Sequence, residues 1–343
     1  GVCEESCTAL GYLSFLLCSL ECFKDSDYIG QLAIALVDKL KANEYLPRVY
    51  LAYFSGAASW IRGAKLTLER LLRGYQVGMQ IGDIENAMLS AFSYLIESFI
   101  YGRSLYELER EADTYMKQMI EYKQMVPKDL TLALQYAILS LKKGPSLMVC
   151  QNVQHSDLLK RAIENNNVPL GFYIYFFCGI ESYIFGKYEA AASMVERRRQ
   201  MEKQMSRRLL MNGMADFFDG LIFIAMARKT SDIKWSVEAT NIVSKMESYA
   251  QNGTHTCEHK LLLLEAELEK NSGNAMAIYE RAIAIAEKNE LVHEQAIASE
   301  RAADFLLRNG DHRASQYYGR AHNLYLQWGA QRKVVHLIES IPF

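Results

Sequence analysis

Residues 255–259 read His-Thr-Cys-Glu-His and follow the pattern H-x-x-E-H. In one class of zinc peptidases this spacing sets two histidines one helical turn apart, where they hold Zn²⁺ while the glutamate activates water. The motif follows the turn-forming pair Asn252-Gly253 directly, so we expect His255 at or before the start of a helix, with the two rings not sharing a face. We predict an ordinary helix start with no metal ligand and no catalytic residue. Adventitious metal binding and zinc catalysis are the alternatives.

Four cysteines near the N-terminus also have a spacing that suggests chemistry. Cys3, Cys7, Cys18 and Cys22 fall on one face of a helix at about 100° per residue. The two pairs lie too far apart along a helix with a rise of about 1.5 Å per residue for one ion to contact all four. We predict instead a stripe of small residues that admits a neighbouring helix. The seven cysteines suggest no disulfide framework, so we expect the cytoplasm or another reducing compartment.

A cluster of basic residues is the third candidate site. Such a cluster can meet phosphate or an acidic protein partner, whereas no interleaved aromatic residues favour nucleic acid. The alternative is a solvated outer helix face on which Glu196 and Glu202 supply partial compensation. We predict a patch for an acidic partner and no nucleic acid binding. The patch consists of Arg197, Arg198, Arg199, Lys203, Arg207 and Arg208.

The motifs of common enzymes are missing from the sequence. A P-loop needs G-x4-G-K-[ST], whose backbone amides cradle phosphate, and no stretch supplies it. A kinase catalytic loop, a DFG motif and a G-x-S-x-G elbow are also absent. We therefore expect no enzymatic activity and no cofactor in this chain.

The composition is that of a chain able to bury a large core. Of its 343 residues, 50% are hydrophobic and 23% charged, and the formal net charge is -2. This charge gives no general attraction to nucleic acid or anionic membrane. No apolar run reaches the roughly 18 residues of a membrane span, so we expect none. The chain opens at Gly1 without an initiator Met, which suggests a piece of a longer polypeptide.

Two stretches near the C-terminus share a small-x3-aromatic-x2-small pattern. One comprises Ala275, Tyr279 and Ala282, and the other Ala314, Tyr318 and Ala321. This spacing is typical of the second helix in tetratricopeptide-type hairpins, where small residues let a neighbouring helix approach and the aromatic ring fills the remaining gap. Weaker copies occur at Leu71-x3-Tyr75-x2-Gly78 and Leu108-x3-Ala112-x2-Tyr115.

Amphipathic helical segments alternate with short Gly/Asp/Asn turns along the whole chain, without strand alternation. We predict an all-α fold, a right-handed tetratricopeptide-like superhelix of about eight helical hairpins in a single array over residues 1–343. Each hairpin is expected to contact only its neighbours, so that the array is elongated. The pairs are predicted to begin near Glu5, Asn43, Asp83, Lys128, Val168, Ser206, Thr256 and Leu291.

Two details of the array are also predicted. The segment 144–156 is the longest interruption and the candidate position for a change of superhelical pitch. Gly329 is expected to end the last full hairpin in the left-handed conformation. A helix over residues 331–340 would then cap the array, with Lys333 and Glu339 facing water.

Four blocks of the sequence resemble the helical segment of large multidomain signalling ATPases. Residues 71–119 contain the Gly-Asp-Ile-Glu-Asn element at 82–86, and residues 279–337 contain the elements EQA..SE.AA.F and Y..WGA..K. GYLSFLLCSLECFKDSDYIGQLAIAL near the start and FYIYFFCGIESYIFGKYEAAA in the middle fit the same family. In that family a kinase-like domain and an AAA-type NTPase precede a tetratricopeptide-like segment, and a GAF domain with a histidine kinase or nucleotide cyclase follows it.

The resemblance implies a non-catalytic segment that couples a signal or partner to nucleotide-dependent switching. Its expected partners are other proteins or sister domains of the same polypeptide. The resemblance brings no catalytic residue with it, because the enzymes of the family lie outside this segment. The alternative is a free-standing tetratricopeptide-like scaffold subunit of a larger assembly.

Overall fold

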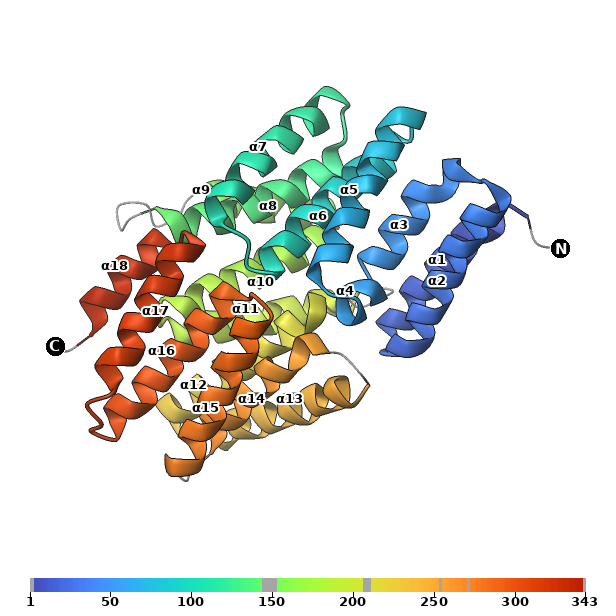
Figure 1. The fold of residues 1–343 in the computed structure, drawn as a ribbon. Coiled ribbons are helices and arrows are strands. Elements are labelled where there is room, and N and C mark those ends of the chain that lie inside the picture. The colour runs from blue at the N-terminus through green and yellow to red at the C-terminus, as the bar shows by residue number, and fades with distance from the viewer. Residues whose placement is uncertain (1–2, 144–152, 206–210, 253–254, 270–271, 342–343) are drawn as a thin grey trace.

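The computed structural model describes residues 3–143, 153–205, 211–252, 255–269 and 272–341. This described part of the chain forms eighteen α-helices and contains no strand, which confirms the predicted all-α class. Figure 1 shows the helices packed side by side along the chain. Their bounds are α1 Glu5–Ser19, α2 Phe23–Leu40, α3 Leu46–Phe54, α4 Ala57–Ile61, α5 Ala64–Ile81, α6 Ile84–Ile100, α7 Leu105–Glu121, α8 Met125–Lys142, α9 Val153–Glu164, α10 Val168–Ile184, α11 Tyr188–Glu202, α12 Met214–Thr230, α13 Ile233–Gln251, α14 Glu258–Leu268, α15 Ser272–Lys288, α16 Val292–Arg308, α17 Ala314–Trp328 and α18 Gln331–Ser340.

The helices follow the pairing that the sequence predicts. Seven of the predicted starts lie within a few residues of the first helices α1, α3, α6, α8, α10, α14 and α16. The eighth, Ser206, lies outside the described residues, and the corresponding helix α12 begins at Met214. Each of these first helices also contacts the first helix of the next pair, from α1 through to α16. The first helices therefore form one continuous inner layer, while the superhelical handedness stays a prediction.

The small-aromatic-small signature is buried at both of its strong copies. Tyr279 and Tyr318 lie inside, and the small residues on either side of each ring are fully covered. The Tyr279 hydroxyl donates to Glu267 Oε1 at 2.9 Å, which satisfies its polar end within the hairpin. The two second helices α15 and α17 thus pack as the pattern predicts.

The expectation of an elongated array whose hairpins contact only their neighbours is wrong. Helix α18 spans residues 331–340 as predicted, but it packs against α8 as well as α17 (Figure 1). Arg332 Nη1 donates to Ser140 O of α8 at 3.0 Å and to Glu181 Oε1 of α10 at 2.8 Å. Tyr249 likewise donates to Glu21 Oε1 at 3.3 Å, joining α13 to the first hairpin. The array therefore folds back, so that C-terminal helices contact earlier hairpins, and we call this arrangement closure.

The prediction that Lys333 faces water is also wrong, and the closure is the reason. Lys333 is 1% exposed, and its ammonium donates to Ile184 O at 2.8 Å and to Glu300 Oε1 at 2.6 Å. The Tyr325 hydroxyl donates to the other oxygen of Glu300 at 2.6 Å. Glu339 is exposed, as expected.

Closure also covers most of the inner layer. Helix α10 is buried nearly all round, including the aromatic-rich run 172–177. Gly102, in the turn after α6, lies against His293 of α16, because a Cβ on Gly102 would come within 2.3 Å of His293 Nδ1. Gly329 has φ +95° and ends α17 in the left-handed conformation, as predicted.

We expect the substitution Lys333→Met to destabilise the fold by about 3 kcal/mol, because it removes the ammonium from a buried carboxylate. The matched control is Arg320→Met, which breaks the exposed pair with Glu287 and should cost less than about 1 kcal/mol. Urea unfolding followed by far-UV circular dichroism measures both. Equal midpoints for the two variants would contradict the buried position of Lys333.

A second comparison tests the contact between distant hairpins. Gly102 and Gly310 each follow a helix C-terminus with φ of +71° and +69°, but a Cβ at Gly310 would meet nothing within 4 Å. Gly310→Ala should cost about 1 kcal/mol of backbone strain. Gly102→Ala should cost a further 1 to 3 kcal/mol, roughly, because it also collides with His293. Thermal unfolding midpoints of both variants give the difference, and its absence would argue against closure.

Candidate binding groove

A groove of about 570 Å³ remains open on the inner layer near the N-terminal half. Five consecutive first helices, α1, α3, α6, α8 and α10, line it together with the short helix α4. The lining is mostly apolar and aromatic with a few charged side chains, and it includes Tyr12, Phe15, Cys18, Arg48, Trp60, Glu85, Leu89, Phe92, Glu97, Val126, Leu130 and Tyr173.

Helical periodicity explains how α6 contributes its wall. The residues that it presents recur every three or four positions and so share one face. The opposite side of α6 packs closely on α5, where a Cβ added to Gly78 would meet the Ala87 Cβ at 2.9 Å. This close packing fixes the face that α6 turns to the groove. That face consists of Glu85, Asn86, Leu89, Phe92, Ser93, Ile96, Glu97 and Ile100.

Trp60 lines the groove and is held by aromatic packing. Its ring stacks on Phe23 with centroids 4.5 Å apart and meets Tyr249 edge-on at 5.1 Å. Tyr249 belongs to α13, so a residue far along the chain supports this wall. Phe92 and Tyr173 meet edge-to-face at 5.4 Å on the adjoining side. Such ring pairs give the groove a preformed shape.

The charges of the groove are few. Arg48 is the one basic side chain among the described lining residues, and it pairs with Asp83 at 3.3 Å. Two carboxylates also line the groove: Glu85 is exposed, whereas Glu97 is 5% exposed. The groove therefore combines an apolar, aromatic wall with acidic groups.

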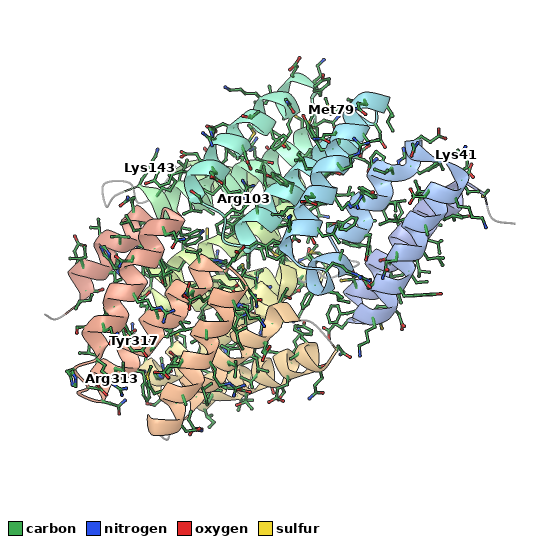
Figure 2. All side chains as sticks on the ribbon, in the orientation of Figure 1. Lys41, Met79, Arg103, Lys143, Arg313 and Tyr317 are labelled. Carbon is green, nitrogen blue, oxygen red and sulfur yellow. The ribbon has the colours of Figure 1, made fainter. Side chains whose placement is uncertain are left out.

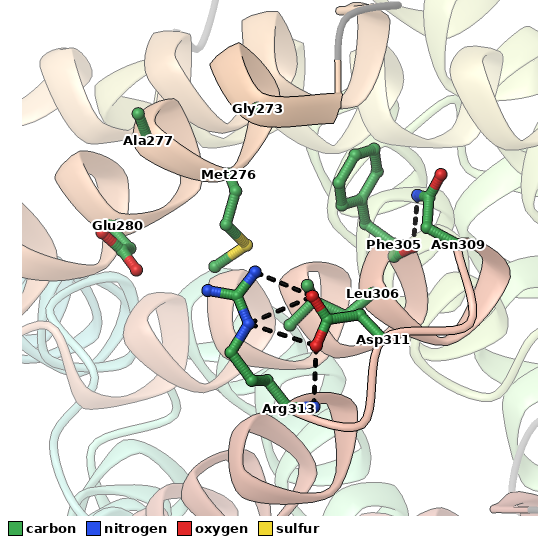
Figure 3. A pocket seen from close by; sticks show the side chains of 9 residues that line it. All are labelled: Gly273, Met276, Ala277, Glu280, Phe305, Leu306, Asn309, Asp311 and Arg313. Atoms are coloured by element: carbon green, nitrogen blue, oxygen red, sulfur yellow. Dashed lines mark hydrogen bonds and ion pairs between the residues drawn. The ribbon is translucent and has the colours of Figure 1, made fainter.

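A second, smaller hollow lies between α15 and the turn after α16 (Figure 3). Its volume is about 380 Å³, and Arg313 reaches across to Asp311, with Nη2 and Oδ2 2.8 Å apart. Hydrogen bonds from Arg313 lower the pKa of Asp311 to about 2, so this carboxylate stays ionised and paired. Arg313 and Asp311 satisfy one another, and the third charged lining residue, Glu280, accepts a hydrogen bond from Tyr317, so this hollow offers a ligand less than the groove does.

The predicted basic patch is divided by the structure. Arg198 is buried and pairs with Asp219 at 2.6 Å, and Arg199 also contacts Asp219. Arg197 and Lys203 are exposed, whereas Arg207 and Arg208 lie outside the described residues. Arg198 therefore belongs to the interface between α11 and α12. Binding of an acidic partner stays a prediction for the exposed residues.

Ion pairs within neighbouring hairpins likewise occupy other basic side chains. Arg103, labelled in Figure 2, follows α6 and contacts Glu107 and Glu111 of α7 at 3.2 and 3.0 Å. Its guanidinium also lies 5.6 Å from the centre of the Tyr94 ring. These contacts tie α6 to α7.

The H-x-x-E-H segment spans a short 3-10 turn, His255–Cys257, and the first residues of α14. Glu258 is exposed while His259 is buried, so the glutamate and this histidine point to different sides. Among the described residues, no group of three or more His, Cys, Asp or Glu side chains is arranged to hold a metal ion. Cys257 and His259 of this segment belong to the interior.

His259 takes part in a buried charge cluster with Lys260 and residues of α16. Glu294 contacts His259 and lies 3.1 Å from the ammonium of Lys260, which also donates to Thr256 O at 2.9 Å. Burial lowers the pKa of His259, and burial lowers the pKa of the adjacent His293 to about 4. Both imidazoles are therefore neutral near pH 7, beside an ionised glutamate.

The cysteine stripe is shorter than the sequence predicts. Helix α1 ends at Ser19, so Cys22 lies in the following turn and is exposed, as is Cys3. Cys7 and Cys18 are buried, and Cys7 packs in a cluster with Ala33 and Val37 of α2 and Val49 of α3. Burial raises the pKa of the Cys18 thiol to about 12, which keeps it protonated although it lines the groove.

Comparison with protein-family models found none that matches this chain, and comparison with curated proteins found no match either. In the described residues, no helix is both long enough and apolar enough to cross a bilayer. The described residues define the class as an all-helical protein built of paired helices.

The sequence did not reveal the groove. Its lining residues have the same apolar spacing as residues that pack between helices, so periodicity alone could not tell an open face from a covered one. Glu97, a charged residue inside the largely apolar segment of α6, was a signal available in the sequence.

The buried histidines predict a pH dependence of stability. Below its ordinary pKa of 6.5 the unfolded chain protonates His293, whereas the folded chain does so only near pH 4. Stability is therefore full above pH 6.5 and falls as the pH drops toward 4, by about 2 kcal/mol between pH 6.5 and 5. Glu294, whose pKa is lowered mainly by Lys260 against the effect of burial, adds a loss only below pH 4.5.

Urea unfolding at pH 5.0, 5.5, 6.0 and 6.5 measures this slope. His293→Asn should flatten it, while His312→Asn, at a side chain 97% exposed, should leave it unchanged. The same slope in wild type and His293→Asn would contradict the assignment.

Proposed function

We propose that this chain is a non-catalytic protein-interaction and regulatory segment that binds a partner along its inner groove. The observation that carries the proposal is the groove itself, which crosses five consecutive first helices. A partner lying there contacts several hairpins at once. Binding therefore favours one relative arrangement of the hairpins over others.

The contacts that close the array give such a change a physical route. Helix α6 lines the groove, and the glycine that follows it lies against His293 of α16. Trp60, which lines the groove, contacts Tyr249 of the C-terminal half. A shift of either groove wall therefore displaces packed side chains in distant hairpins.

The resemblance of the four sequence blocks suggests the setting. We propose that the chain is the helical coupling segment of a multidomain signalling ATPase, with sister domains or other proteins as its partners. A free-standing scaffold subunit is the second candidate, supported by the helical array alone. The complete open reading frame separates the two, since an upstream P-loop favours the first.

Substitution of exposed groove residues tests the proposal without loss of the core. Tyr12 and Val126 line the groove and are 49% and 56% exposed, so Tyr12→Glu with Val126→Glu should fold normally. In the full polypeptide we expect partner binding, and nucleotide hydrolysis if an NTPase is present, to change roughly tenfold, which corresponds to about 1.4 kcal/mol.

The matched control is Ile120→Glu with Ile233→Glu, two exposed apolar residues outside the groove, which should change neither quantity. Deletion of residues 1–343 should reproduce the effect of the groove variant. Unchanged binding and unchanged output in both the groove variant and the deletion would refute the function.

A further inference from the structure

The outer side of the N-terminal hairpin is apolar. Figure 1 shows α1 and α2 at one end of the array, with α3 packed along one side of them. Leu13 and Leu16 of α1 and Leu20 at its C-terminal end are between 41% and 64% exposed. Residues 6–20 include no charged residue, although charged side chains usually cover the exposed side of a helix. A hairpin at the end of a helical array needs a polar outer side to stay in solution on its own, so we expect a partner to cover this apolar side.

Helix α2 continues the apolar surface with Tyr28 and Leu32, which are 66% and 44% exposed. Gly11 of α1 and Gly30 of α2 both pack closely on α3. At about 100° per residue, the exposed leucines of α1 lie opposite Gly11, and Tyr28 and Leu32 lie opposite Gly30. Both helices therefore present these apolar side chains on the side that faces away from α3.

Four charged residues of α2 border this apolar surface. Lys24 and Asp25 lie in the first turn of the helix, and Asp38 and Lys39 lie in its last turn. All four are exposed, and no ion pair joins any of them to another residue in the described part of the chain. The two ends of α2 thus carry one basic and one acidic residue each, in mirrored order.

The mirrored order makes α2 complementary to an antiparallel copy of itself. When a two-fold axis passes close to Leu32, Lys24 lies opposite Asp38 of the second copy. Asp25 lies opposite Lys39 in the same arrangement, and symmetry repeats each contact on the other side of the axis. A parallel copy would instead place each charge against its own kind, which is unfavourable.

We propose that the outer side of α1 and α2 is a dimerisation surface whose partner is a second, antiparallel copy of this chain. Burial of the apolar side chains supplies the driving force, and the charged ends of α2 set the orientation. Within the array, α1 and α2 already pack on α3, so the N-terminal hairpin of a second copy continues the same kind of helix packing on their other side. The surface is separate from the groove, and the inference goes beyond the function proposed above.

Sedimentation equilibrium of the full chain from roughly 1 to 100 µM measures the dissociation constant of the dimer. Leu16→Glu with Leu32→Glu should raise this constant by a factor of at least about 30, because carboxylates would be buried among apolar side chains. Both positions are exposed in one copy, so the variant should fold normally. The matched control is Ile120→Glu with Ile233→Glu, two exposed apolar residues of other helices, which should leave the constant unchanged.

Charge reversal tests the orientation. Lys24→Glu alone or Asp38→Lys alone brings like charges together and should weaken the dimer roughly tenfold. The two substitutions in one chain restore opposite charges across the axis and should return the dissociation constant to that of the wild type. An acidic residue in the first turn and a basic residue in the last turn both suit the helix dipole, so the fold should be kept. Far-UV circular dichroism of each variant checks this.

Each outcome of these measurements decides one part of the inference. A chain that stays monomeric at the highest concentration would overturn it. A dimer that Leu16→Glu with Leu32→Glu leaves intact would overturn it as well, because another surface then holds the two copies together. A dimer that this variant dissociates, but that charge reversal does not weaken, would keep the surface and overturn the antiparallel orientation.

Discussion

The structure depends on ion pairs that become buried when the C-terminal helix α18 packs against earlier hairpins. Lys333 lies inside with Glu300, and Arg332 lies inside with Glu181. A buried ion is costly without a partner, so each of these pairs can exist only when α18 is in place against α8, α10 and α16. Each pair therefore forms only in the closed arrangement. The pairs thus make the contacts between distant hairpins specific.

Closure determines which part of the inner layer stays open. In a simple helical array the whole inner layer is accessible, but here the C-terminal hairpins pack back on the earlier ones and cover the inner faces of α10 and α16. The groove is the part of the inner layer that this packing leaves open. Its lining residue Trp60 is supported by Tyr249, so the shape of the groove depends on the closed fold.

Burial also explains why the potentially reactive cysteine and histidine side chains of this protein stay neutral. Cys18 lines the groove but is held as a thiol, and His259 and His293 are held as neutral rings. In the interior, these three side chains contribute to packing and to the buried charge cluster. What remains at the accessible surface of the groove is suited to recognition: rings, aliphatic side chains and carboxylates.

The sequence by itself determined the helical class, the positions of the hairpins and the buried signature around Tyr279 and Tyr318, because these follow from local periodicity and short-range spacing. It did not determine that Lys333 is buried, that Arg198 pairs inward, or which apolar faces stay open. The burial of Lys333 depends on contacts with residues more than a hundred positions away, such as Ile184. The inward position of Arg198 depends on Asp219 of the neighbouring helix α12. Only the tertiary structure decided them, since an exposed and a buried helix face have the same apolar spacing until a distant partner covers one of them.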